Sequence, residues 1–244
     1  MTYWLLGYPD KSLTAARGAI DLAGELDHPF SSCQASVYGA FAYQFRGQER
    51  EVETHGSKGM ATASDNGFPS WLGWGSVATS WAHVRQGRHE NVIDNMRRSL
   101  AQLRSIGIDY FMPYMLSMLA DAYGLLDKPE EGLAVTLEAL NKARETGEFW
   151  WQAELHRQEG EFRLAVDDDA AAAESCFFTA IEFAQRQSAK SLELRAATSL
   201  ARHWQGEGKG GAARDLLHPV YDWFTEGFDT PDLKDAKALL DELA

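Results

Sequence analysis

Apolar residues recur along this chain at the spacing of an α-helix, in segments of roughly 20 residues that short polar breaks separate. The stretch from 92 to 103 shows the pattern clearly, with one helical face formed by Val92, Met96, Leu100 and Leu103. The same periodicity returns from the first segment to the last. The pattern therefore predicts an all-α protein.

The breaks between the segments repeat every 40 residues. Gly and Asp often end helices because they tolerate a positive φ angle. Two interleaved series of breaks, offset by 20 residues, run through the chain: Gly7, Gly47, Gly87, Asp127, Asp167 and, one residue late, Gly208; and Asp27, Gly67, Gly107, Gly147 and Gln187. Two breaks per repeat give two helices per repeat, which predicts a right-handed α-solenoid of about six helical hairpins.

The period divides the chain into units of one domain, residues 1–244. Residues 1–28 form an incomplete first unit, and full units follow at 29–68, 69–108, 109–148, 149–189 and 190–226. Residues 227–244 are predicted to form a capping helix, with Thr230 as its N-cap and Pro231 in its first turn. We expect the helix at 48–65 to be the weakest, because Gly56 and Gly59 each cost about 1 kcal/mol relative to Ala.

The first unit has only residues 1–6 where its first helix should lie. We expect Trp4, Leu5 and Leu6 to cover an apolar edge there, which would invite self-association. The incomplete unit thus suggests either a homodimer that forms through it or a chain cut from a longer one.

Small residues recur at one position of each unit's first helix, as in tetratricopeptide repeats: Ala40, Ser80, Ala120, Gly160 and Ala201. The aromatic position three residues later holds Tyr43, Tyr123 and Trp204 but fails at His83 and Arg163. The hairpins therefore resemble tetratricopeptide units with slightly lengthened helices.

Several runs make the resemblance more specific, namely 5–10, 67–74, 150–157 and above all 219–230. They resemble the C-terminal tetratricopeptide region of bacterial signalling proteins that join an adenylate/guanylate cyclase domain to an AAA or STAND-type ATPase. The resemblance implies a regulatory or sensor region without catalytic activity. The Gly-rich run 206–211 lacks the spacing of a phosphate-binding loop, so neither ATPase nor cyclase activity is expected, and the chain is predicted not to be an enzyme.

The net charge of -13 disfavours nucleic acid and anionic membranes as partners. Cys33 and Cys176 lie in apolar helical patterns, as small buried residues do in a reducing compartment, which points to the cytoplasm. The seven histidines show no metal-ligand spacing. We therefore expect no metal and no cofactor.

Tetratricopeptide stacks line their concave face with four positions of the first helix of each unit. That register selects the following candidate binding residues: Phe41, Trp74, Trp81, Tyr114, Asp121, Glu154, Arg157, Glu161, Arg195 and Arg202. Aromatic groups beside fixed charges suit a protein or peptide ligand in the groove, and alternatively a small molecule. For Trp74 and Trp81, packing between neighbouring hairpins is an equal alternative to ligand binding. For Glu154 and Arg157, the alternative is an ion pair within one helix.

Overall fold

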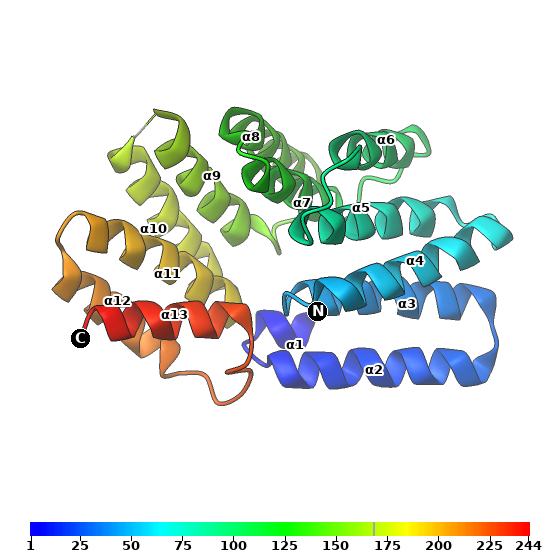
Figure 1. Cartoon of the computed structure of the whole chain (residues 1–244), viewed down its shortest axis with the longest axis horizontal. Helices are drawn as coiled ribbons and strands as arrows, with labels where there is room; N and C mark the ends of the chain where they lie inside the picture. The colour runs from blue at the N-terminus through cyan, green and yellow to red at the C-terminus, as the bar shows by residue number, and fades with distance from the viewer. Residues whose placement is uncertain (168) are drawn as a thin grey trace.

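A computed structural model describes residues 1–167 and 169–244 and shows thirteen α-helices within them (Figure 1). Their bounds are α1 Thr2–Leu5, α2 Pro9–Leu26, α3 Pro29–Gln44, α4 Glu49–Asn66, α5 Pro69–Arg85, α6 Val92–Ser105, α7 Met112–Leu125, α8 Pro129–Thr146, α9 Gln152–Asp167, α10 Ala170–Arg186, α11 Lys190–Gly206, α12 Gly210–Tyr221 and α13 Pro231–Glu242. The all-α prediction is confirmed. Within the described ranges, no helix has the length and apolarity needed to cross a membrane.

The periodic breaks lie where the helices end. The glycines of both series, from Gly7 to Gly208, have positive φ angles, and so do Asp27 and Asp127. At the break predicted for Gln187, the left-handed residue is its neighbour Ser188, with φ 55°. Of the break at 167–169, Asp169 is described: its carboxylate accepts a hydrogen bond from the Ala172 amide at 3.1 Å and caps α10.

The helices stack as an α-solenoid (Figure 1). The first helix of a hairpin packs both on its own partner and on the first helix of the next hairpin, as α3 does on α4 and α5, and α7 on α8 and α9. Such stacking buries an apolar face that no hairpin could bury alone. One apolar core extends from Trp4 to Leu192, and a second joins α10 to α13.

The helix predicted to be weakest, α4, contains glycines that allow close packing. A Cβ added at Gly59 would lie 2.6 Å from a Val37 methyl group of α3, and one at Gly56 would collide with Thr79 of α5. Both glycines are buried. The sequence prediction counted their cost in helix propensity and missed this packing between neighbouring helices.

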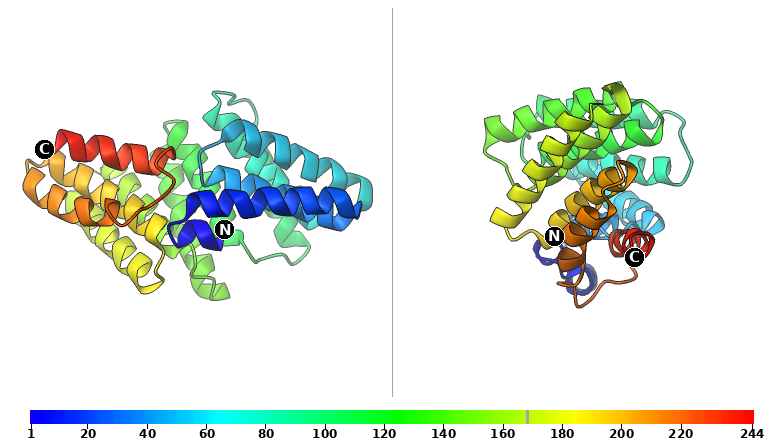
Figure 2. Two further views of the ribbon diagram at one scale, coloured as in Figure 1. Left: turned by 90° about the horizontal axis from the view of Figure 1, so that it is seen from below. Right: turned by 90° about the vertical axis from the view of Figure 1, so that its left-hand side faces the viewer.

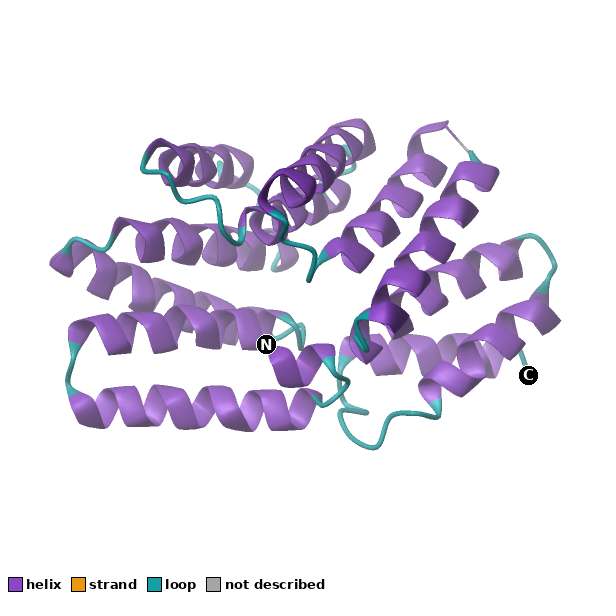
Figure 3. Ribbon diagram, turned by 180° about the vertical axis from the view of Figure 1, so that it is seen from behind, coloured by secondary structure: helices purple, strands orange, loops and turns teal. Residues whose placement is uncertain are grey.

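The two ends of the solenoid meet, so the arc of helices closes on itself (Figures 2 and 3). We call the contacts of residues 4–11 and Arg46 with residues 190–231 the closure interface. Ser191 of α11 donates a hydrogen bond to the Trp4 carbonyl at 2.6 Å. The guanidinium of Arg195 lies 4.7 Å from the centre of the Trp4 ring. Helix α1 is thereby fixed against α11.

Ionic contacts extend the closure interface to α2 and to Arg46, which follows α3. The carboxylate of Glu226 accepts hydrogen bonds from the Asp10 and Lys11 amides at 2.9 and 3.0 Å, and so caps the N-terminus of α2. Arg46, with a side chain only 5% exposed, bridges Asp10 at 2.7 Å and Asp229 at 2.8 Å. One buried cation thus ties the first hairpin to the loop before α13.

The closure interface corrects the expectation that Trp4 lies at an apolar N-terminal edge open to self-association. Trp4 is only 1% exposed, because it stacks on Phe45 with ring centres 4.5 Å apart and lies beside Trp151. Leu6 is 37% exposed and Leu5 is partly buried. Trp4 therefore belongs to the core of its own chain, and a homodimer through this edge cannot use it.

Candidate functional site

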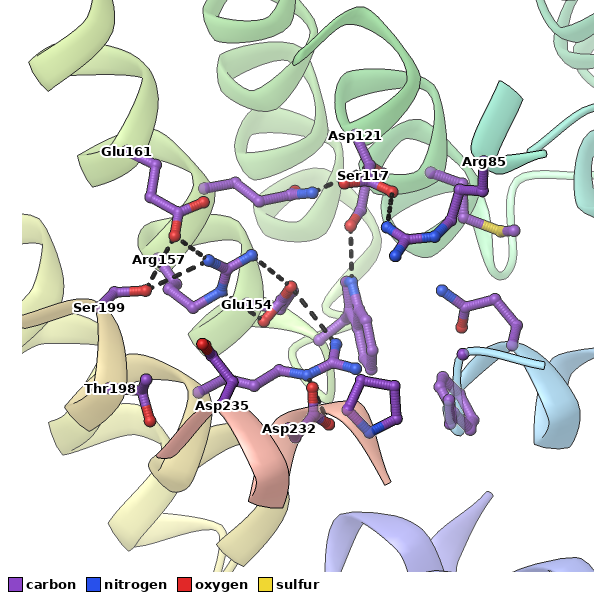
Figure 4. A pocket seen from close by; sticks show the side chains of 18 of the residues that line it. Arg85, Ser117, Asp121, Glu154, Arg157, Glu161, Thr198, Ser199, Asp232 and Asp235 are labelled. Carbon is purple, nitrogen blue, oxygen red and sulfur yellow. Dashed lines mark hydrogen bonds and ion pairs between the residues drawn. The ribbon is translucent and has the colours of Figure 1, made fainter. Parts of the chain in front are cut away.

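The closed arc encloses a cavity of about 200 Å³ on its concave side (Figure 4). Helices α5, α7, α9 and α11 present side chains to it, α3 contributes Gln44, and α13 contributes Asp232 and Asp235. The C-terminal helix and the closure interface thus shorten what would otherwise be an open groove.

Seven of the predicted binding residues line this cavity: Trp81, Asp121, Glu154, Arg157, Glu161, Arg195 and Arg202. The other three do not. Phe41, Trp74 and Tyr114 have no exposed surface, so as ligand contacts these three predictions are wrong. For Trp74, the alternative of packing between hairpins is correct.

The three aromatic residues are buried because the first half of the arc fills its own concave side. Tyr114 meets Phe41 edge to face at 5.4 Å and Trp151 at 5.0 Å, and its hydroxyl donates to Gln44 at 3.0 Å. Trp74 packs on Trp71 at 4.9 Å. Rings on successive helices fill the space that the repeat register assigned to a groove.

Charged residues of α9 form the centre of the cavity wall (Figure 4). Arg157 donates to Glu154 at 2.8 and 3.0 Å, and it also pairs with Glu161. Burial alone would raise the pKa of Glu154, but Arg157 and Arg195 outweigh it and lower that pKa. The sequence analysis gave this ion pair as the alternative to ligand binding for Glu154 and Arg157. The structure shows that the two residues form the pair and also line the cavity.

The capping helix supplies two carboxylates that the sequence prediction missed. Arg195 donates to Asp232 at 3.0 Å, and Arg202 pairs with Asp235 at 2.6 Å. Burial raises the pKa of Asp232, although Arg195 opposes the shift. The sequence analysis interpreted this helix only as the cap of the C-terminal end of the solenoid. The acidic residues on one of its faces were the signal that could have placed it opposite these arginines.

Asp121 lies at the other side of the cavity. Its carboxylate accepts a hydrogen bond from the Trp81 indole at 2.6 Å, and Arg85 lies 3.8 Å away. Burial is the largest influence on Asp121 and raises its pKa, against the opposing effects of Arg85 and Trp81. The positive charge around Asp121 therefore does not fully compensate its loss of water.

The cavity wall has a small excess of negative charge. It contains four guanidinium groups, from Arg85, Arg157, Arg195 and Arg202, and five carboxylates, from Asp121, Glu154, Glu161, Asp232 and Asp235. Each of these carboxylates already contacts one of the guanidinium groups, but five carboxylates share four arginines, and the contact of Asp121 with Arg85 is the longest at 3.8 Å. Such a wall suits a cationic group better than an anion.

Metal-ligand geometry occurs elsewhere, in a group that the histidine spacing did not reveal. Ligand atoms of Glu174, His203 and Glu207 lie within 4.8 Å of one another. Glu207 pairs with Lys209 at 2.7 Å, and Glu174 accepts from the Trp204 indole at 3.0 Å. These carboxylates therefore already have partners in the protein. The sequence prediction missed the group because it compared the spacing of the histidines with one another and did not compare His203 with nearby glutamates.

The chain matches no family model. It is 25% identical over 200 residues to "Uncharacterized protein R02095" of Rhizobium meliloti (strain 1021), a match that covers 82% of this chain and 19% of that protein. The chain thus spans about a fifth of the length of this relative.

Among solved structures, the chain is similar to BtubC (BKLC) from P. vanneervenii, with a TM-score of 0.62, 15% identity, and coverage of 96% and 92% of the two chains. It is also similar to a STAND protein with a tetratricopeptide repeat sensor from Pyrococcus horikoshii, with a TM-score of 0.58 and 15% identity over 97% of this chain and 44% of that one. The chain is also similar to the tetratricopeptide-like repeats of a putative kinesin light chain from Podosopora anserina, with a TM-score of 0.56 and 16% identity. This match covers 80% of this chain and 95% of that one. At these identities the likeness shows the fold, a tetratricopeptide-like solenoid.

Proposed function

We propose that this chain is a non-catalytic recognition module, the sensor or regulatory region of a signalling protein, and that its cavity binds the cationic group of a peptide ligand. The observation that carries the proposal is the excess of carboxylates in a cavity where burial raises the pKa of both Asp121 and Asp232. A carboxylate with a raised pKa gains from a cation placed beside it. A guanidinium or ammonium group supplies that charge.

The regulatory part of the proposal is supported by the likeness to the repeat region of a STAND protein that is described as a sensor. It agrees with the resemblance of the runs 67–74 and 219–230 to cyclase–ATPase signalling proteins. We further propose that the 244 residues act as one repeat domain. We also propose that the module works in the cytoplasm, because the free thiols of Cys33 and Cys176 are stable in a reducing compartment.

A small cationic metabolite is the second candidate, and the closure interface favours it. A cavity of about 200 Å³ has room for one side chain or one small molecule, whereas a groove along the whole concave face would accept a longer segment. Both candidates share the same chemistry at Asp121 and differ in whether the rest of a peptide adds binding energy.

The test is a library of capped pentapeptides with varied flanks and a central arginine, citrulline or glutamate, measured by isothermal titration calorimetry. Citrulline keeps the shape of arginine and removes its charge. We expect arginine peptides to bind about 10- to 100-fold more tightly than their citrulline twins, since a hydrogen bond to a charged group contributes about 1.5 to 3 kcal/mol. Equal affinities for the three central residues would contradict the proposal.

A single capped arginine separates the two candidates. If it binds as tightly as the best pentapeptide, the ligand is a small cation. If the pentapeptide binds at least about tenfold more tightly, the flanking residues contribute and a peptide is the ligand.

A further inference from the structure

Three side chains of metal-ligand type come together at the end of α11, apart from the residues that line the cavity. His203 and Glu207 are four residues apart, so they share one side of α11, where Glu207 is the C-cap. Glu174 belongs to α10, which packs beside α11 (Figure 1). One ligand atom of each side chain lies within 4.8 Å of the other two. The packing of α10 on α11 thus brings one imidazole nitrogen close to two carboxylate oxygens.

The imidazole of His203 is buried and has an unpaired nitrogen. Its side chain is only 9% exposed, and its Nε2 has no hydrogen-bond partner among the residues that the structure describes. This nitrogen faces Glu207, whose Oε1 lies 3.8 Å away, a distance too long for a hydrogen bond. A buried polar atom without a partner is unfavourable in a folded protein. A metal ion between Nε2 and the carboxylates would give this nitrogen a partner.

Both carboxylates keep an oxygen that can turn to a metal ion. The Trp204 indole donates to Oε1 of Glu174 at 3.0 Å, and the Lys209 ammonium contacts Oε2 of Glu207 at 2.7 Å. Each of these contacts uses one oxygen of its carboxylate. A hydrogen bond such as the one from Trp204 orients a carboxylate that binds a metal. The Lys209 side chain is 50% exposed, so its ion pair is a weak competitor.

We propose that Glu174, His203 and Glu207 bind a divalent transition-metal ion such as Zn²⁺. A tetrahedral zinc ion with bonds of about 2.0 to 2.2 Å holds its ligand atoms about 3.4 Å apart. The 3.8 Å between His203 and Glu207 is close to this spacing, and the long side chain of Glu174 can close the remaining gap. The imidazole favours a transition metal over Mg²⁺ or Ca²⁺, which prefer oxygen ligands. Because Glu207 is exposed, an ion from solution can reach the site.

A zinc site here departs from the expectation that the chain binds no metal, which rested on the spacing of the histidines alone. The ion would tie α10 to the end of α11 and so stabilise this hairpin. The cavity uses different residues, so zinc can bind whether or not the cavity binds a cation.

The site is tested by calorimetric titration of the full chain with Zn²⁺, after dialysis against a chelator and then against chelator-free buffer. We expect one Zn²⁺ per chain and no binding of Mg²⁺ at the same concentration. His203→Ala should weaken zinc binding by at least about 100-fold, because the loss of an outer hydrogen bond alone costs about 10- to 100-fold in metal sites. The matched control is His218→Ala. His218 also lies four residues before a carboxylate, 3.1 Å from Asp222, but its side chain is 52% exposed, so its removal should leave the affinity unchanged.

Two further variants test the roles of the carboxylates. Glu174→Gln keeps an oxygen for the Trp204 indole but removes the negative charge, and should weaken zinc binding by about tenfold or more. Lys209→Ala frees Oε2 of Glu207 and removes a competing cation. It should strengthen zinc binding by up to about fivefold, the factor that corresponds to an exposed ion pair. Circular dichroism verifies that each variant keeps its helix content.

Three results would overturn the proposal. The first is a wild-type chain that binds no zinc. The second is an equal zinc affinity of His203→Ala and His218→Ala, which would place any bound zinc elsewhere on the surface. The third is an unchanged affinity of Glu174→Gln, which would remove α10 from the site.

Discussion

Trp4→Ala tests whether the closure interface stabilises the solenoid. Trp4 is 1% exposed and stacks on Phe45, while Arg195 lies over its ring. Replacing a buried Trp by Ala costs about 3 to 5 kcal/mol, through lost burial and the cavity that remains. The contact with Arg195 contributes about 0.5 to 2 kcal/mol of this. We therefore expect the free energy of unfolding to fall by about 3 to 5 kcal/mol.

The assay is urea unfolding followed by the helical signal in circular dichroism, with Tyr3→Ala as the matched control. Tyr3 lies next to Trp4 in α1 but is 51% exposed, so its removal should cost less than about 1 kcal/mol. Small-angle scattering of Trp4→Ala under native conditions should show a larger radius of gyration, since the ends of the arc would separate.

A loss within 1 kcal/mol of the control would refute the reasoning, because Trp4 would then contribute nothing beyond an exposed aromatic residue. An unchanged radius of gyration together with a large loss of stability would show that the ionic contacts of Arg46 hold the ends together without Trp4.

Three further predictions concern individual residues. Gly227→Ala should destabilise the fold and open the arc in small-angle scattering, because Gly227 has a φ of 77° and a Cβ there would collide with Pro9. Gly160→Ala should lower the unfolding free energy by about 1 to 3 kcal/mol in urea titrations, since the new Cβ would lie 2.6 Å from the Phe177 ring. Hydrogen bonds from His156 and Arg163 lower the pKa of Glu159 from 4.5 to about 2, so its stabilisation is present above pH 4.5 and lost as the pH falls towards 2. Glu159→Gln should therefore cost up to about 3 kcal/mol at pH 7, and less and less below pH 4.5.

The repeat architecture could be predicted from the sequence because helix ends depend on local chemistry. Gly67, Gly107 and Gly147 end their helices through positive φ angles, a property that a single residue type signals. The closure could not be predicted in this way. Gly7 was visible as a breaker, but its contact with Trp223, like that of Gly227 with Pro9, joins segments about 215 residues apart. No local pattern encodes that separation.

The candidate site was predictable where the repeat register holds and the side chains are charged. Asp121, Glu154 and Arg157 line the cavity, where each of these charged groups has a partner of opposite charge. Phe41 and Tyr114 occupy the same register positions, but they pack against rings of neighbouring helices. The repeat register predicts which way a side chain points. Whether a ligand can reach that side chain depends on how the neighbouring helices pack against it.

The central claim, that the acidic side of the cavity binds a cation, is tested most directly by calorimetric titration of Asp121→Asn with the best arginine pentapeptide. An Asn at this position can still accept the Trp81 hydrogen bond, and because burial raises the pKa of Asp121, removing its charge should not destabilise the protein. Asp65→Asn, which removes an exposed carboxylate on α4, is the control.

The proposed function predicts that Asp121→Asn weakens the peptide by about tenfold or more while the control binds as wild type does. It also predicts that the wild-type affinity falls as the pH is lowered towards the raised pKa of Asp121, and that the variant loses this dependence. Equal affinities of wild type, variant and control for the arginine peptide would contradict it.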